Sequence, residues 1–230
     1  MGVGWITGCR CIRLSRVTSV RILAQRERGD FADLLATLTP EQWSMASLCK
    51  GWTVRDVAAH TVAYLDQSRV RLMIEMLRDR WDVDRLNANA LERRAGLKPE
   101  FLVRLMQDGV EPSGAGALYG GRVALIECLV HQQDIRRPLG CLRSIPHDRL
   151  CVALNYARVS PVIGGARRTR GVRLVATDTD WSAGRGPDVC GTGEALLLAM
   201  TGRLFPVIDE LRGPGLQRLR SVEGNPFPNL

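Results

Sequence analysis

The stretch that decides the fold is residues 51–60, which read GWTVRDVAAH. Thr53 followed three residues later by Asp56 is a capping-box pattern, in which the threonine hydroxyl accepts a hydrogen bond from the aspartate amide and the carboxylate turns back to the helix start. The pattern predicts a helix that begins after Thr53 and carries His60 on an apolar face. The two alanines before that histidine are small enough for a second helix to come close.

A second helix is predicted around residues 124–135, which read ALIECLVHQQDI. Glu127 and His131 lie four residues apart, so they share one helix face, one turn apart. This carboxylate and imidazole can hold one ion, with His60 as a third ligand. Three such ligands with an open fourth position are typical of catalytic zinc, and the same donors also suit nickel, iron or manganese. A helical salt bridge and a hydrogen-bonded core histidine are the plainer interpretations.

Apolar residues at helical spacing predict an up-down bundle over most of the chain. The expected helices are 20–38, 40–43, 54–80, one or two within 85–110, 118–135 and 148–159. After these, strand alternation and turn residues replace the helical period. There we expect strands at 171–177, 188–190 and 216–222, turns at 178–187 and a helix at 193–204. The protein is therefore expected to be mainly α, with a metal-binding helical bundle at 20–165 and a small α+β domain at 166–230.

Residues 1–19 begin with a short apolar stretch that arginines follow, the reverse of a signal peptide. We expect them to form a disordered extension, or one translated from a start site assigned too far upstream. The seven cysteines are an odd number without a CxxC pair, so neither a secreted disulfide framework nor a zinc ribbon fits. A reducing cytoplasm is the expected location, and no apolar run is long enough to span a membrane.

The basic charge is concentrated in two blocks. The net charge is +8, and residues 136–170 hold eight arginines and one aspartate while residues 1–28 hold six arginines and one glutamate. Such blocks can attract nucleic acid or a small anion. Aromatic residues make up only 5% of the chain, so the stacking platforms of single-strand binders are not expected. We therefore predict solvated arginine surfaces and no nucleic-acid partner.

Several further residues are weaker candidates. Arg203 has the chemistry to bind a substrate carboxylate, although a surface or structural arginine is the more common interpretation. Asp134 lies three residues after His131 and can orient that ring through a hydrogen bond, although capping of the helix end or a surface salt bridge fits equally. Cys49 and Cys128 are expected to pack in the core rather than act as nucleophiles. The glycines at 184–193 are read as turn residues, because no phosphate-loop pattern follows them.

Three segments together resemble a known family. They are DFADLLATLTPEQWSMASLCKGWTVRDVAAH (30–60), ECLVHQQDIRRPLG (127–140) and GVRLVATDTDWSAGRGPDVCGTGEALLLAMTGR (171–203). The chain resembles the actinobacterial mycothiol-dependent maleylpyruvate isomerase family, which belongs to the DinB/YfiT-like metal-binding superfamily. The resemblance implies a DinB-like up-down four-helix bundle with a small C-terminal α+β domain. It also implies that a divalent metal, expected to be Zn²⁺, is held by His60, Glu127 and His131.

For function, the resemblance implies an enzyme that uses mycothiol as a co-substrate. The metal would activate the thiol for S-transfer or for cis–trans isomerisation of a small electrophile such as maleylpyruvate, with Arg203 as the hypothetical catalytic residue that holds a carboxylate. The alternative is a non-catalytic metal-binding or stress protein of the same superfamily. The expected partners are the small thiol and the electrophile, without nucleic acid or membrane, and the expected state is a monomer or homodimer.

Overall fold

The computed structural model describes residues 18–65, 68–80, 82–94 and 96–223. The expected extension at residues 1–19 thus lies almost entirely outside the described residues. The chain divides into two compact units between Tyr156 and Ala157, inside a helix rather than at residue 165. Within the described ranges, no helix is both long enough and apolar enough to cross a membrane.

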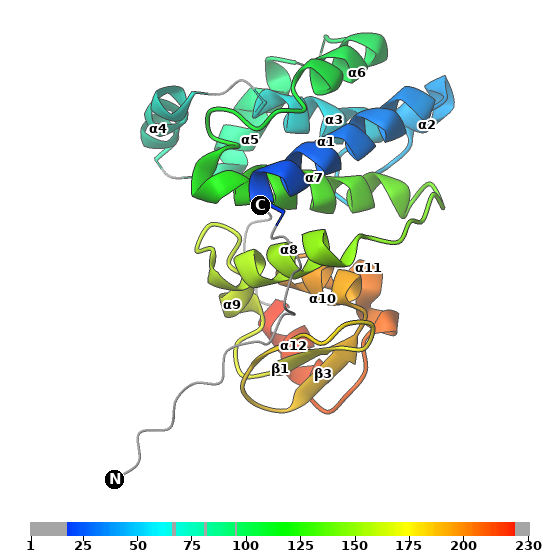
Figure 1. Ribbon diagram of the computed structural model, residues 1–230, viewed down its shortest axis with the longest axis vertical. Helices are drawn as coiled ribbons and strands as arrows, with labels where there is room; N and C mark the ends of the chain where they lie inside the picture. Colours follow the sequence, from blue (N-terminus) through cyan, green and yellow to red (C-terminus); the bar gives the residue numbers. More distant parts are fainter. Residues whose placement is uncertain (1–17, 66–67, 81, 95, 224–230) are drawn as a thin grey trace. The chain divides into compact units, whose positions relative to one another are not determined.

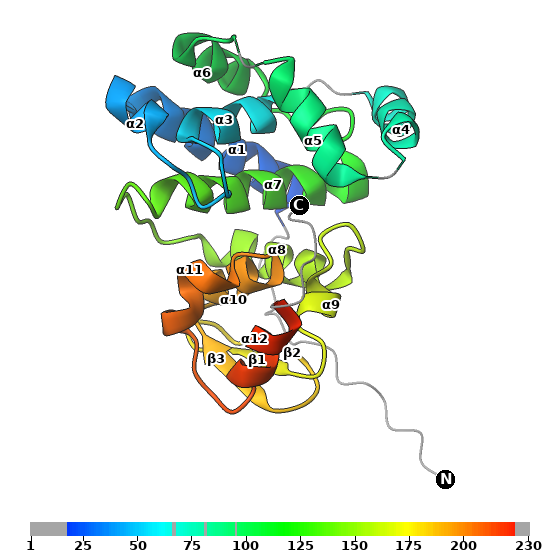
Figure 2. The same cartoon turned by 180° about the vertical axis from the view of Figure 1, so that it is seen from behind.

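The first unit is a four-helix bundle. Helix α1 contacts α6 and α7, and α3 contacts the same two helices, which closes the four into a ring (Figures 1 and 2). The predicted fold class is confirmed. The helices of this unit are α1 (Val20–Thr37), α2 (Pro40–Ser44), α3 (Val54–Ala63), α4 (Arg69–Arg78), α5 (Val83–Glu92), α6 (Pro99–Asp108), α7 (Leu118–Arg136) and most of α8 (His147–Val159).

Helix α3 starts as the sequence predicts. The Asp56 amide donates to Thr53 Oγ1 at 3.2 Å, and the Thr53 amide donates to Asp56 Oδ2 at 2.9 Å. The prediction of one continuous helix over residues 54–80 is wrong, because α3 ends at Ala63 and a new helix, α4, begins after Ser68. The Ser68 hydroxyl accepts a bond from the Arg71 amide at 3.1 Å, and serine is a favoured residue at a helix start.

The bundle encloses one large apolar cluster. Its largest fully buried side chains come from three of the four helices: Phe31 and Leu35 from α1, Leu102 and Met106 from α6, and Ile135 from α7. Ala58 and Ala59 of α3 are also buried in this cluster. Because these alanines add little bulk, α3 can lie close to its neighbours.

A buried ionic network lies on a different side of α7. The Glu27 side chain of α1 is fully buried and accepts bonds from Gln132 Nε2 and Arg149 Nη1, each at 2.7 Å. Arg143 pairs with the same carboxylate. Arg136 Nε in turn donates to Gln132 Oε1 at 3.1 Å. Arginines from the basic block at 136–170 are thus partners of a buried acid rather than a free surface.

The second unit holds a small sheet and short helices. Its strands are β1 (Arg173–Ala176), β2 (Ser182–Gly184) and β3 (Asp188–Gly191), in the order β2-β1-β3, with β1 antiparallel to β2 and parallel to β3. Helix α10 (Gly193–Met200) packs against β1 and β3. The remaining helices are α9 (Gly165–Arg168), α11 (Leu204–Val207), the 3₁₀ turn Ile208–Glu210 and α12 (Leu216–Glu223).

Two expectations for this unit are wrong. Residues 216–222 form helix α12 rather than a strand, and the apolar residues there recur every three positions, with Leu219 buried. That period suits a helix and not a strand. Residues 182–184 form strand β2 rather than a turn. Periodicity could not identify β2, because the segment has three residues and no apolar alternation.

The buried network predicts a large stability loss on removal of its acid. Glu27→Ala leaves Arg143 and Arg149 without their shared buried partner, which should lower the free energy of unfolding by about 3–5 kcal/mol. The control is Glu111→Ala, which breaks the exposed pair with Arg21 and should cost about 0–1 kcal/mol. Denaturant titration followed by circular dichroism measures both, and equal losses would contradict the network's role.

Candidate metal centre

Helix α3 carries the first candidate ligand. His60 lies two turns into this helix and is 4% exposed. Its ring packs between two aromatic side chains, with centroid distances of 5.0 Å to Trp52 and 5.1 Å to Tyr64. The capping box at Thr53 fixes where the helix starts, and the helical period then turns His60 towards α7.

Helix α7 carries the other two candidates. Its first turn is irregular over Tyr119–Gly121, and Glu127 and His131 lie in the regular part that follows. His131 Nε2 is 3.4 Å from Glu127 Oε2, and His60 Nε2 is 3.8 Å from the same oxygen. One donor atom from each of the three residues lies within 4.8 Å of the others. The structure therefore brings together the three residues that the sequence singled out.

These separations fit a divalent metal. Zinc binds imidazole nitrogen and carboxylate oxygen at about 2.0–2.2 Å, so tetrahedral ligands lie about 3.4 Å apart. The observed 3.4 and 3.8 Å are close to that spacing. The Glu127 side chain is 37% exposed, whereas those of His60 and His131 are 5% and 8% exposed. The donor set is therefore reached by solvent on the glutamate side.

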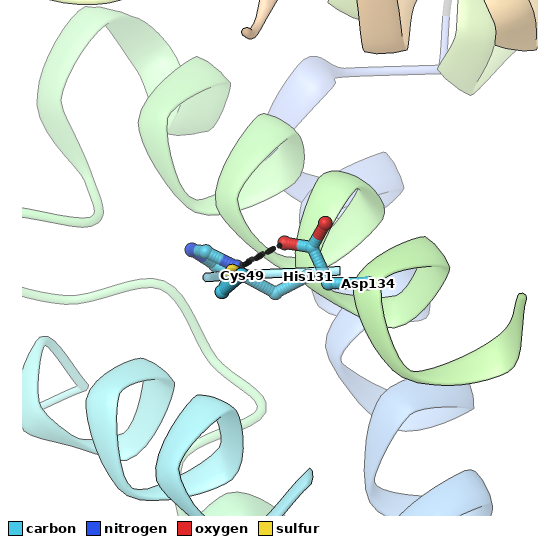
Figure 3. A group of neighbouring side chains, drawn as sticks. All are labelled: Cys49, His131 and Asp134. Atoms are coloured by element: carbon cyan, nitrogen blue, oxygen red, sulfur yellow. Dashed lines mark hydrogen bonds and ion pairs between the residues drawn. The ribbon is translucent and has the colours of Figure 1, made fainter. Parts of the chain in front are cut away.

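Asp134 holds His131 from behind. His131 Nδ1 lies 2.9 Å from Asp134 Oδ2, and the Asp134 side chain is fully buried. A carboxylate accepts, so the imidazole carries a proton on Nδ1, and its Nε2 faces Glu127. Figure 3 shows the Asp134 carboxylate beside the His131 ring. Of the roles that the sequence left open for Asp134, the structure shows the hydrogen bond to His131.

Cys49 is a neighbour that the sequence did not reveal. Its thiol donates to Asp134 Oδ2 at 3.2 Å (Figure 3), and the preceding Leu48 amide donates to the Asp134 carbonyl at 3.0 Å. Cys49, His131 and Asp134 are close enough to form a second donor group for an ion. In that group, however, the thiol and the imidazole both donate to one carboxylate oxygen, so hydrogen bonds already account for the arrangement.

The charges of the three candidates shift one another's pKa values. Burial acts to raise the pKa of Glu127, but hydrogen bonds and charges from His131 and His60 outweigh it and hold the pKa below its ordinary value. For His131 burial acts to lower the pKa, and hydrogen bonds from Asp134, Cys49 and Glu127 raise it well above the usual value. Without metal, the centre therefore holds an ionised glutamate beside a protonated histidine.

The remaining sequence candidates lie elsewhere. Burial raises the pKa of the Cys128 thiol to about 12, which agrees with its interpretation as a core residue. His147 begins α8, and its Nε2 lies 3.5 Å from Cys151 Sγ. Arg203 belongs to the second unit, where it is 9% exposed and its Nη1 donates to the Thr201 carbonyl at 2.6 Å. Neither His147 nor Arg203 belongs to the donor groups found among the described residues.

Comparisons with known proteins support the fold. Residues 24–115 match the family model described as the mycothiol maleylpyruvate isomerase N-terminal domain. No curated protein matches the sequence. Two solved structures share the fold, that of a mycothiol-dependent maleylpyruvate isomerase and that of its histidine-to-alanine mutant. Each has a TM-score of 0.58 and 14% identity, covering 85% of this chain and 91% of the other.

The family match contains only one of the three candidate ligands. His60 lies inside the matched residues, whereas Glu127 and His131 lie beyond them. The solved structures are too distant in sequence to show more than the fold. The metal centre therefore rests on the geometry of this chain.

The hydrogen bond between His131 Nδ1 and Asp134 predicts that a variant without it binds metal more weakly. Asp134→Asn keeps the size of the side chain but removes the negative charge, and its amide can present a donor to Nδ1 and favour the wrong tautomer. Loss of such a partner typically costs about 10–100-fold in metal affinity, which zinc titration against a competing chelator measures. The control is Asp56→Asn at the helix cap, for which we expect a change of less than about threefold.

The raised pKa of His131 predicts proton release on metal binding. At neutral pH this imidazole is protonated in the metal-free protein, and a ligand histidine must lose that proton, so zinc should displace about one proton. Glu127 releases no proton on metal binding, because its lowered pKa keeps it ionised at neutral pH. Apparent zinc affinity should then fall about tenfold per pH unit below the pKa of His131. Calorimetry in two buffers of different ionisation enthalpy tests this, and heats that do not depend on the buffer would refute it.

Proposed function

We propose that this chain, whose residues 24–115 match the model of the mycothiol maleylpyruvate isomerase N-terminal domain, belongs to that family and is a metal-dependent enzyme that activates mycothiol. The thiol would serve in S-transfer or in cis–trans isomerisation of a small electrophile such as maleylpyruvate. The observation that supports the proposal is the convergence of His60, Glu127 and His131 within 4.8 Å. We propose these three residues as the ligands of a divalent cation, expected to be Zn²⁺.

The donor set suits thiol activation. A divalent cation held by these ligands would keep a coordinated thiol in its thiolate form at neutral pH, and the thiolate is the nucleophile. The residues of the chain supply the rest. Asp134 fixes the His131 ring with its proton on Nδ1, and only the Glu127 side of the centre is well exposed. Three protein ligands leave a position for an exogenous sulfur, as in other catalytic zinc sites.

Such a nucleophile has two uses. It can conjugate an electrophile, or it can add to an activated alkene, permit rotation about the resulting single bond and leave again by breaking the same C–S bond. In either reaction a cationic group is needed for an anionic substrate. We propose Arg203 as one such group. It is an arginine of the second unit, and the proposal rests on its chemistry rather than on any distance to the metal centre.

The alternative is a non-catalytic metal-binding or stress protein. The solved structures with this fold are those of an isomerase, which favours the enzyme. A monomeric or homodimeric state, a cytoplasmic location and the lack of a nucleic-acid partner remain predictions from the sequence.

The deciding experiment combines metal analysis with a thiol-dependent assay. The full chain should contain roughly one metal ion, and His60→Ala, Glu127→Ala and His131→Ala should each lose it together with calorimetric mycothiol binding. His147→Ala is the matched control, because it removes the remaining histidine, which lies outside the donor set, and should keep both.

Turnover of maleylpyruvate or a model electrophile should require both metal and mycothiol. Stoichiometric metal without thiol-dependent turnover would favour the non-catalytic alternative. If His60→Ala, Glu127→Ala or His131→Ala keeps its metal, the ligand assignment is overturned. In the same assay, Arg203→Ala with unchanged KM and kcat would remove that residue from the proposal.

A further inference from the structure

Helix α4 carries an exposed apolar stripe. Of the twelve large apolar side chains that are exposed among the described residues, four lie on this ten-residue helix. They are Val70, Met73, Ile74 and Leu77, and each is 52–70% exposed. Because they follow one another at three, four and seven positions from the first, all four lie on one helix face. Single exposed apolar residues are ordinary, whereas a continuous apolar face marks a binding surface.

The opposite side of α4 holds the helix against the bundle. Leu72 and Met76 are partly buried, and α4 packs mainly on α5 at the edge of the bundle (Figures 1 and 2). The helix therefore has apolar residues on two sides, and packing within the bundle uses only one of them. Because the stripe lies on a single peripheral helix, it forms a narrow ridge rather than a groove.

The exposed charges of residues 70–80 are all positive. The two acids of this segment turn inward, since the Glu75 side chain is 12% exposed and pairs with arginines, and Asp79 is 5% exposed and accepts from an asparagine of α5. The nearest described acid that is exposed, Asp82, is the N-cap of α5. Among the described residues, no ion pair engages Arg78 or Arg80. The exposed charged side chains of the segment are Arg71, Arg78 and Arg80.

An anionic membrane surface fits this combination of an apolar ridge and exposed arginines. Amphipathic helices that lie in the membrane interface bury their apolar face at the boundary of the lipid chains, and their cations attract anionic headgroups. The long arginine side chain reaches the headgroups while its stem lies along apolar surface. A bilayer accepts a ridge formed by one helix, whereas a protein partner must supply a groove for it.

A second copy of this chain fits the stripe less well. An isologous contact between two α4 helices would bring the same arginines of both copies together. Like charges that face each other across an interface cost binding energy. The net charge of +8 on the whole chain adds to the repulsion between copies and to the attraction to an anionic surface.

We propose that α4 docks this protein on an anionic membrane surface, with the apolar stripe among the lipids and the exposed arginines of residues 70–80 at the headgroups. This contact is peripheral and differs from a membrane span, for which no described helix is both long and apolar enough. It departs from the expectation, drawn from the sequence, of no membrane partner. Docking requires neither metal nor thiol, so its test is independent of the proposed function.

Co-sedimentation of the full chain with lipid vesicles tests the proposal. Vesicles of phosphatidylglycerol and phosphatidylcholine in equal amounts should bind the protein, and vesicles of phosphatidylcholine alone should bind it about tenfold or more weakly. Binding to the anionic vesicles should also weaken as NaCl rises from about 0.1 M to about 0.5 M, because salt screens the arginines. If the wild-type chain does not bind the anionic vesicles, the stripe is left to a protein partner and the proposal is overturned.

Two double variants separate the apolar part of the contact from the charged part. Ile74→Ser/Leu77→Ser shortens the stripe, and Arg78→Gln/Arg80→Gln removes two of its cations. Each should lower the partition coefficient into anionic vesicles about tenfold or more. All four side chains are exposed, so the melting temperature should stay within about 2 °C of the wild-type value.

The matched controls remove the same chemistry elsewhere in the chain. Leu142→Ser/Val162→Ser removes two exposed apolar side chains, and Lys98→Gln/Arg104→Gln removes two exposed positive charges at α6. Each control should keep the partition coefficient within about twofold of the wild-type value, because distant exposed charges are largely screened. A fall in the controls as large as that in the α4 variants would overturn the proposal, since it would show unspecific adhesion of a basic protein.

Analytical ultracentrifugation without vesicles distinguishes a second copy from a membrane. The wild-type chain should have the mass of a monomer, or of a dimer that Ile74→Ser/Leu77→Ser leaves intact. A dimer that dissociates in this variant would place a second copy on the stripe and overturn the proposal.

Discussion

The close packing of α3 against α7 is the constraint on which the candidate site depends. His60 comes from one helix and the Glu127–His131 pair from the other, and their donor atoms converge only because the two backbones lie close together. Buried Ala58 and Ala59 add little bulk on α3, which permits that approach. The cost of placing a glutamate between two histidines is offset by the hydrogen bonds between these side chains, and would be offset further by the proposed metal.

Polar groups on two sides of α7 fix its rotation about its own axis. On one side, Asp134 holds His131 and accepts the thiol of Cys49. On another, Gln132 and Arg136 join the network around buried Glu27. A buried polar group that loses its partner costs a large part of a domain's stability. Rotation of α7 by even a fraction of a turn would break hydrogen bonds on both sides. The networks that stabilise the bundle therefore also fix the direction in which Glu127 and His131 point.

Ion pairs with glutamates explain part of the arginine-rich composition. Arg136, Arg143 and Arg149 come from the most basic block of the sequence, yet in the fold they surround Glu27 and its amide partner. Arg71 and Arg93 converge on Glu75 beside the metal centre instead. Arginines that the sequence suggests are free surface charges are therefore in part engaged in ion pairs with buried or half-buried glutamates.

The sequence by itself determined the start and phase of α3, the shared face of Glu127 and His131, and the mainly helical bundle. These features follow from local rules, because a capping box acts over three residues and the helical period acts over four. Only the tertiary structure decided that α3 ends at Ala63, that Cys49 meets Asp134 and that Arg71 and Arg93 share Glu75. Those side chains are separated by 85 and 22 positions in the chain, and no local pattern encodes a contact that exists only after the helices have packed.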